Sequence, residues 1–325
     1  MKSPRLALLA APLLILAVAA ALTTADAVSV KADRGADGSA SLQVEAEPGT
    51  FYRLEASDNL SDWRGVVTAE GAGSADHADF AARGKTARYY RAADLGEGGA
   101  FTGDHIQTAA GEVIVHPINH ASFVLKWGDL YIYNDPVGAA SLYAGIPAAD
   151  LILVGHQHGD HRSNATIDAV RKAGTSIVVP DDVLGRLSTA QQALATALDN
   201  GESATLLGIQ IDAVPAYNKT AAYHPKGRDN GYVLTIGGTR FYMSGDTEDV
   251  DEMRALQNID VAFLAMNQPF TMTIDQAADA ARAFQPKVVY PYHFRNSDNS
   301  IANLSRFKEL VGSDLGIEVR VRDWY

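Results

Sequence analysis

The feature that most constrains this chain is a run of metal-binding side chains directly after an apolar segment. Residues 151–154 read Leu-Ile-Leu-Val, and His156, His158, Asp160 and His161 follow almost at once. Two histidines two positions apart do not share one face of a helix, but they converge in a tight loop at a strand end. Neutral imidazoles and a carboxylate are good zinc ligands. The segment therefore predicts a buried strand that leads into a metal site.

The part of the chain around this segment alternates two kinds of apolar pattern. Between residues 105 and 325, short strand-like runs are separated by helical periods at 165–173, 274–284 and 301–311. This alternation favours layered α/β packing over a helical bundle. The chain contains no cysteine. Any metal must therefore be held by histidine and carboxylate, and a thiol nucleophile is excluded.

The histidine-rich segment resembles the signature of the metallo-β-lactamase superfamily, and later motifs follow in that family's order. Asp135 is similar to the acidic residue that ends an early strand, Asp246 in Gly-Asp-Thr to the bridging carboxylate, and His293 in Pro-Tyr-His-Phe-Arg to the last histidine. The resemblance covers residues 113–325. Its last two motifs look closest to the branch of ascorbate-phosphate lactonases and N-acylphosphatidylethanolamine phospholipase D. It implies a four-layer αββα sandwich over residues 105–325.

The resemblance also implies two metal positions bridged by Asp246. The expected ligands are His156, His158, Asp160, His161, His224, Asp246 and His293. Asp160 and Asp246 are the expected catalytic residues, because they would hold and orient a hydroxide that forms on the metals. Zinc is the first choice of metal, and Mn²⁺ or Fe²⁺ fits the same histidine and carboxylate shell.

One position departs from the family's pattern. The third histidine of the first metal position is expected after the strand-like run 209–216, where this chain has Asn218. His224 stands six residues later and can reach back into the site, so we expect it to be the ligand. The alternatives are Asn218 itself, a water molecule, or a site with one firmly held metal.

Further residues are expected to support the ligands or to contact the substrate. They are His120, Asp135, Asn218, Tyr223, Lys226, Tyr292 and Arg295. His120 precedes a strand-like run and is a candidate for orienting a ligand or touching the substrate. The two tyrosines, the lysine and the arginine are candidates for binding an acidic substrate group or protonating a leaving group. The polar loop 267–272 lines the pocket or caps the helix that follows.

The beginning of the sequence has the pattern of a secretory signal peptide. Lys2 and Arg5 precede the apolar run 6–22, and residues 25–27 provide small residues at the Ala-x-Ala spacing. We therefore expect residues 1–27 to be removed on export to the periplasm or the medium. The alternative is an uncleaved membrane anchor, because the run is at the lower limit for spanning a bilayer. A lipid-anchored lipoprotein is excluded, because no cysteine is present.

Residues 28–95 alternate apolar and polar positions in short pieces, which predicts a small antiparallel β module. The stretch 51–63, closed by residues 88–91, resembles small β-sandwich modules appended to many secreted bacterial proteins. Residues 96–104 are glycine-rich and predict a linker. Trp63 and the tyrosines of the module fill its core or form a glycan-binding face. His77 and His105 are expected in solvent.

Together these patterns predict an exported metal-dependent hydrolase of an ester, lactone or phosphodiester bond. The substrate is expected to be a small or lipid-like molecule. A net charge of −12 disfavours nucleic acid as a partner, and a membrane is expected only through an uncleaved N-terminal segment. The alternative is a non-catalytic, metal-stabilised scaffold with a glycan-binding β module. The sequence predicts no oligomeric state.

Overall fold

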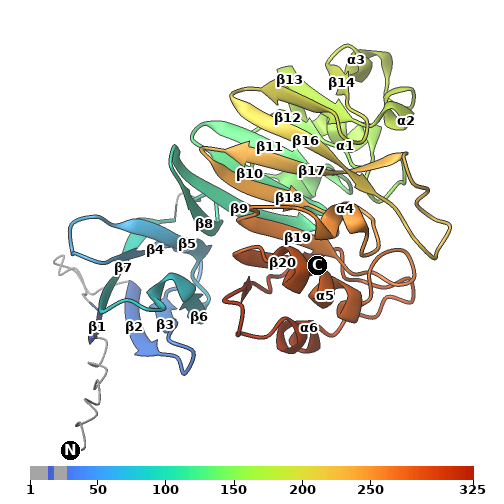
Figure 1. The fold of residues 1–325 in the computed structure, drawn as a ribbon. Helices are drawn as coiled ribbons and strands as arrows, with labels where there is room; N and C mark the ends of the chain where they lie inside the picture. The colour runs from blue at the N-terminus through green and yellow to red at the C-terminus, as the bar shows by residue number, and fades with distance from the viewer. Residues whose placement is uncertain (1–13, 18–27, 98) are drawn as a thin grey trace, which may run out of the picture. The chain divides into compact units, whose positions relative to one another are not determined.

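The computed structural model describes residues 14–17, 28–97 and 99–325 (Figure 1). The chain divides into two compact units, Met1–Ile106 and Gln107–Tyr325. Of the predicted signal peptide, residues 1–27, only strand β1 (Leu14–Ala17) lies within the described residues. Among the described residues, no helix is long and apolar enough to cross a membrane.

The first unit is a small β module, as its alternating pattern predicts. A three-stranded antiparallel sheet contains β2 (Val28–Arg34), β3 (Ala40–Ala46) and β6 (Gly73–Asp79). A second group of strands contains β4 (Phe51–Ser57), β5 (Arg64–Glu70), β7 (Ala87–Gly96) and β8 (Gly103–Thr108), and the short helix η1 (Phe80–Ala82) precedes β7. Leu42, Leu54, Tyr52 and Tyr90 pack in one buried core. Two of the tyrosines therefore fill the core.

Two features of this unit differ from the sequence-based prediction. His105 was expected in solvent, but it is 5% exposed, and its Nε2 lies 2.8 Å from the Thr68 hydroxyl. The reason is that β8 begins inside the predicted linker and pairs with β5. His77 is half-buried, with Nε2 2.6 Å from the Tyr52 hydroxyl. The Trp63 ring is covered by the guanidinium of Arg91, whose Cζ lies 4.3 Å from the ring centroid.

The second unit contains two mixed sheets. The first has β9 (Gly111–Asn119), β10 (Ser122–Trp127), β11 (Leu130–Asn134), β12 (Ala149–Leu153), β13 (Arg171–Val179) and β14 (Ala195–Ala197). The second has β15 (Ser203–Leu206), β16 (Ile209–Ala216), β17 (Asp229–Ile236), β18 (Thr239–Met243), β19 (Val261–Ala265), β20 (Val288–Tyr292) and β21 (Glu318–Val319). The two sheets pack face to face. Phe123 of β10 in the first sheet stacks on Phe263 of β19 in the second, with ring centroids 4.3 Å apart.

Short helices accompany both sheets (Figure 1). Helices α1 (Asn164–Val170), α2 (Asp181–Leu184) and α3 (Thr189–Gln192), with the short η2 (Ala140–Tyr143), belong to the first sheet. Helices α4 (Asp251–Arg254), α5 (Ile274–Phe284) and α6 (Leu304–Val311) belong to the second. The arrangement is the predicted αββα sandwich. The predicted helix 165–173 ends early, because the chain enters β13 at Arg171.

Parallel pairing determines where the loops of the second unit meet. Strands β11, β12 and β13 are parallel neighbours, and so are β18, β19 and β20. The carboxyl ends of parallel strands lie at the same edge of a sheet. The loops after β12 in the first sheet and after β18 and β20 in the second carry the predicted ligands except His224, and ligand atoms from these three loops lie within 4.8 Å of one another.

Candidate metal centre

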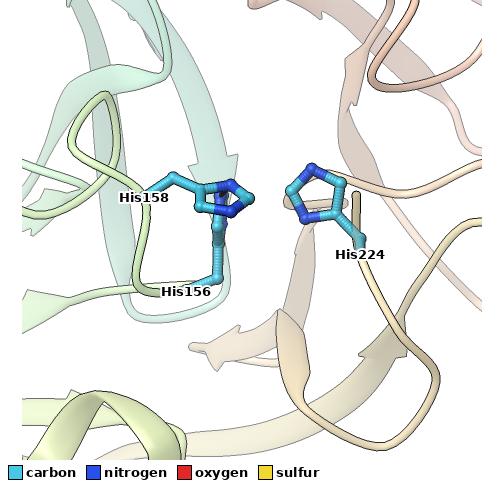
Figure 2. A group of neighbouring side chains, drawn as sticks. All are labelled: His156, His158 and His224. Carbon is cyan, nitrogen blue, oxygen red and sulfur yellow. Dashed lines mark hydrogen bonds between the residues drawn. The ribbon is translucent and has the colours of Figure 1, made fainter. Parts of the chain in front are cut away.

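Three histidines from two loops form the first group of the centre. His156 and His158 follow β12, and His224 lies in the loop between β16 and β17. Figure 2 shows the rings of His156 and His158 turned toward the ring of His224. One ligand atom from each lies within 4.8 Å of the others. His156 and His224 are buried, and His158 is half-buried. His224 therefore takes the place expected for the third ligand.

Two carboxylates and two histidines form the second group. Its members are Asp160, His161, Asp246 and His293, and their ligand atoms also lie within 4.8 Å of one another. His161 Nε2 lies 3.2 Å from Asp246 Oδ1 and 3.9 Å from Asp160 Oδ2. His293 Nε2 lies 3.4 Å and 3.6 Å from the same two oxygens. Three members are buried, whereas the Asp160 side chain is 47% exposed.

Asp246 faces both groups at once. Its Oδ1 belongs to the second group, while its Oδ2 lies 3.5 Å from His224 Nε2 and 4.0 Å from His156 Nε2. Gly245 makes this placement possible, because its φ is +61° and an added Cβ would lie 2.7 Å from the Asn230 carbonyl oxygen. Only glycine fits such a position without strain.

The chemistry of this donor set fits divalent metal ions. His161 Nε2 and Asp246 Oδ1 are buried and form no hydrogen bond with any described residue, although they lie 3.2 Å apart. Buried polar atoms without partners are rare in folded proteins. Ligands about 2.1 Å from a tetrahedral zinc ion lie about 3.4 Å from one another. This is close to the 3.1 Å between His156 Nε2 and His158 Nδ1 and to the 3.2 Å and 3.4 Å from Asp246 Oδ1 to His161 and His293. The potential ligand atoms thus converge as metal ligands do.

Asn218 positions His224 and is not itself placed as a ligand. The Asn218 N–H donates to the His224 carbonyl at 2.8 Å, and the His224 N–H donates to Asn218 Oδ1 at 2.9 Å. Asn218 Nδ2 donates to the Phe270 carbonyl at 2.8 Å. Both polar atoms of the amide are therefore engaged. On the far side of the ring, Asp229 Oδ2 lies 3.0 Å from His224 Nδ1 and orients the imidazole.

In the second group, Asp135 orients the His161 ring as Asp229 orients that of His224. Its Oδ2 lies 2.8 Å from His161 Nδ1, and its Oδ1 accepts the Gly155 N–H at 2.8 Å. The carboxylate leaves the opposite nitrogen, Nε2, for a ligand position. Asp135 and His293 have φ values of +42° and +47°, a left-handed conformation that L-residues rarely adopt. Such backbone geometry is concentrated at functional sites.

His120 also contacts the second group. Its Nε2 lies 3.2 Å from Asp160 Oδ2, and its ring centroid lies 3.7 Å from that of His293. The Tyr325 hydroxyl lies 3.3 Å from His120 Nδ1. Asn267 Nδ2 lies 3.3 Å from His293 Nε2. His120 was expected near the ligands, whereas sequence reasoning missed Tyr325 and the contact of Asn267.

Burial and charge set the protonation of the centre. Burial lowers the pKa of His156 well below 6.5, and the neighbouring His161 adds to this effect. Burial opposes the charge on His161, but Asp246 and Asp135 outweigh it and raise the pKa well above 6.5. Burial alone would raise the pKa of Asp160, but the hydrogen bond with His120 and the nearby His293, whose Nε2 lies 3.6 Å away, outweigh it and lower the pKa well below 3.8. The Asp160 carboxylate is therefore ionised and available to a cation.

Three residues that the sequence suggested for substrate contact differ in their burial and in their partners. Tyr292 is 0% exposed, and its hydroxyl accepts the Gly245 N–H at 3.0 Å, so it supports the loop before Asp246 and does not face the substrate. Lys226 is exposed and pairs with Glu252 at 2.8 Å, and its contact with an acidic substrate group stays a prediction. Tyr223 is 44% exposed, and its ring packs edge-on against Phe270 in the loop 267–272.

Comparisons with known proteins agree with this geometry. A family model for the beta-lactamase superfamily domain matches residues 115–293. A UPF0173 metal-dependent hydrolase of Thermococcus kodakarensis is 32% identical over 204 residues, which cover 60% of this chain and 90% of the relative. A similar hydrolase of Thermus thermophilus is 30% identical over 217 residues, covering 62% and 96%.

Solved structures give the same result. A Parabacteroides distasonis protein described as a metal-dependent hydrolase is 42% identical, with a TM-score of 0.62 over 69% of this chain and 99% of that one. A metallo hydrolase of Ignicoccus hospitalis is 25% identical, with a TM-score of 0.56 over 65% and 95%. These relatives favour an enzyme over the non-catalytic scaffold. The chain belongs to the metallo-β-lactamase superfamily and is a metal-dependent hydrolase.

Proposed function

We propose that the two groups of the candidate centre bind two divalent metal ions, with zinc as the first choice and Mn²⁺ or Fe²⁺ as alternatives. His156, His158 and His224 would hold the first ion, and Asp160, His161 and His293 the second. One observation carries the proposal: Asp246 presents one oxygen to each group, as a bridging ligand does. The donors are nitrogen and oxygen only, which does not select among these metals.

The two ions would lower the pKa of a bound water molecule and polarise the oxygen of a carbonyl or phosphoryl group. The protein would orient the attacking water through Asp160. Asp160 Oδ2 already faces His120 and His293, so its other oxygen is available to accept a hydrogen bond from the attacking water. Its 47% exposure makes Asp160 the member of the centre most open to a substrate. Asp246 is buried and would remain a ligand throughout.

We propose an ester, lactone or phosphodiester bond as the bond that is cleaved, in a small or lipid-like substrate. The exposed Tyr223 ring, on the loop that carries His224, packs against Phe270 and forms an apolar surface with it. Such a surface suits the apolar part of a substrate. Metal analysis of the purified protein followed by hydrolysis assays on a lactone, an aryl ester, a phosphodiester and a β-lactam tests this proposal. Turnover of the β-lactam alone would contradict it.

Export is a separate part of the proposal. The support is the order of Lys2, Arg5, the apolar run 6–22 and the small residues at 25–27. Mass spectrometry of the protein from a secretion-competent host should show a chain that starts after residue 27 in the periplasm or the medium. An intact N-terminus in the membrane fraction would support an uncleaved anchor instead, and an intact chain in the cytoplasm would exclude both.

A further inference from the structure

Arg295 lies close to the candidate metal centre along the chain, and no described acidic residue pairs with it. It lies two residues after His293, just beyond β20. Within the described part of the chain, no hydrogen bond or ion pair holds its guanidinium, and its Nε is buried without a partner. By contrast, Arg254 and Arg282 pair with aspartates at 2.6 Å and 2.7 Å. The chain has 39 acidic and 27 basic residues, so acidic partners are plentiful. An arginine beside the centre that pairs with none of the described ones is therefore a candidate for binding an anionic ligand.

The guanidinium of Arg295 is nevertheless held in place. Its Cζ lies 4.2 Å from the centroid of the Tyr325 ring, in a cation–π contact. The Arg295 N–H donates to the Tyr325 hydroxyl at 3.1 Å, and the residue forms a β-bridge with Ile301. Stacking uses the flat face of the guanidinium, whereas its N–H donors point outward in the plane. The terminal donors are therefore positioned in advance and free to bind a ligand.

The ring that supports Arg295 also contacts the centre. The Tyr325 hydroxyl lies 3.3 Å from His120 Nδ1, and His120 Nε2 lies 3.2 Å from Asp160 Oδ2. Tyr325 and His120 therefore connect Arg295 to Asp160, the exposed member of the second group. A planar fork of N–H donors matches the two oxygens of a carboxylate or phosphate.

We infer that Arg295 binds an oxyanion group of the substrate, a carboxylate or a phosphate, that is separate from the bond being hydrolysed. This inference rests on the proposed function and narrows the substrate to an acidic ester, lactone or phosphodiester. Tyr325 acts as a positioning residue, because it holds the guanidinium by its ring and the Arg295 backbone by its hydroxyl. The oxyanion of the substrate then forms the ion pair with Arg295 that no described acidic residue forms.

Calorimetric titration of the metal-loaded protein with inorganic phosphate, and in parallel with acetate, tests this inference. Arg295→Gln should raise the Kd of at least one anion about tenfold or more, because charge-assisted hydrogen bonds are lost. Arg295→Lys should fall between wild type and Arg295→Gln, since it keeps the charge but loses the fork. Arg306→Gln, on the exposed face of α6, is the matched control and should bind as wild type does.

The anion with the larger effect identifies the phosphate or the carboxylate as the recognised group. A Kd within about twofold of wild type for both anions in Arg295→Gln would overturn the inference, and so would a wild-type protein that binds neither. The titration needs no turnover. Its failure is therefore distinguishable from failure of the proposed function, which would appear as absent hydrolysis by the metal-loaded wild type.

Discussion

Asn218 and His224 are joined by two reciprocal hydrogen bonds, one between backbone groups and one from the His224 N–H to the Asn218 side chain. The pair closes the loop that delivers His224 to His156 and His158. The structure thus places a histidine from later in this loop, rather than residue 218 itself, beside His156 and His158.

The first prediction follows from this pair. Asn218→Ala leaves the His224 N–H and the Phe270 carbonyl without their partner, so the loop should lose its fixed geometry. We expect the affinity of the first metal position to fall about tenfold or more, measured by competition with a chromophoric chelator. Asn218→Asp keeps an acceptor for the His224 N–H, so the affinity of the first metal position should fall less than in Asn218→Ala. Lys219→Ala, an exposed neighbour on the same loop, should leave the affinity unchanged. Equal affinities in Asn218→Ala and Lys219→Ala would refute the positioning role.

Asp135 gives the equivalent prediction for the second position. Asp135→Asn keeps the acceptor for the Gly155 N–H but removes the charge beside His161 Nδ1. Loss of such a supporting carboxylate typically lowers metal affinity about 10–100-fold. The chelator titration should show this loss at the second position only. Asp150→Asn is the control, because Asp150 pairs with Lys172 away from the ligands. A comparable loss in the control would show a general loss of stability.

Buried tyrosines predict a loss of stability at alkaline pH. Burial raises the pKa of Tyr52 from 10.0 to about 12. The unfolded chain therefore loses this phenol proton before the folded chain does. The resulting stabilisation is fully present below pH 10 and is lost as the pH rises through about 12. Calorimetric unfolding across this window should show a shallower decline in Tyr52→Phe, by about one proton per molecule. An identical slope in the variant would contradict the assignment.

The sequence predicted the contiguous part of the centre because its donors are close together. His156, His158, Asp160 and His161 share one loop, and a loop at a strand end allows few arrangements. The reach of His224 was also predicted, from the length of the segment after Asn218. In both cases the residues involved lie within a few positions of one another, so the sequence pattern alone could predict that they come together.

The supporting residues could not be predicted in the same way. Tyr325 meets His120 across 205 positions of sequence, and no local pattern marks such a contact. Asp229 carries one weak signal, a carboxylate at the start of a buried strand, where a charge needs a partner. The burial of His105 depends on β8 pairing with β5, which a glycine-rich segment does not indicate. These relationships arise from tertiary packing.

The central claim is that seven side chains hold two metal ions with Asp246 between them. Metal content after exhaustive dialysis, measured by mass spectrometry, tests it most directly. We expect about two equivalents per chain in the wild type and about one in His224→Ala, because the first group loses one of its three ligands and the second keeps all of its own. Lys219→Ala should again match the wild type. Two equivalents retained in His224→Ala, or a wild type that holds only one, would contradict the account.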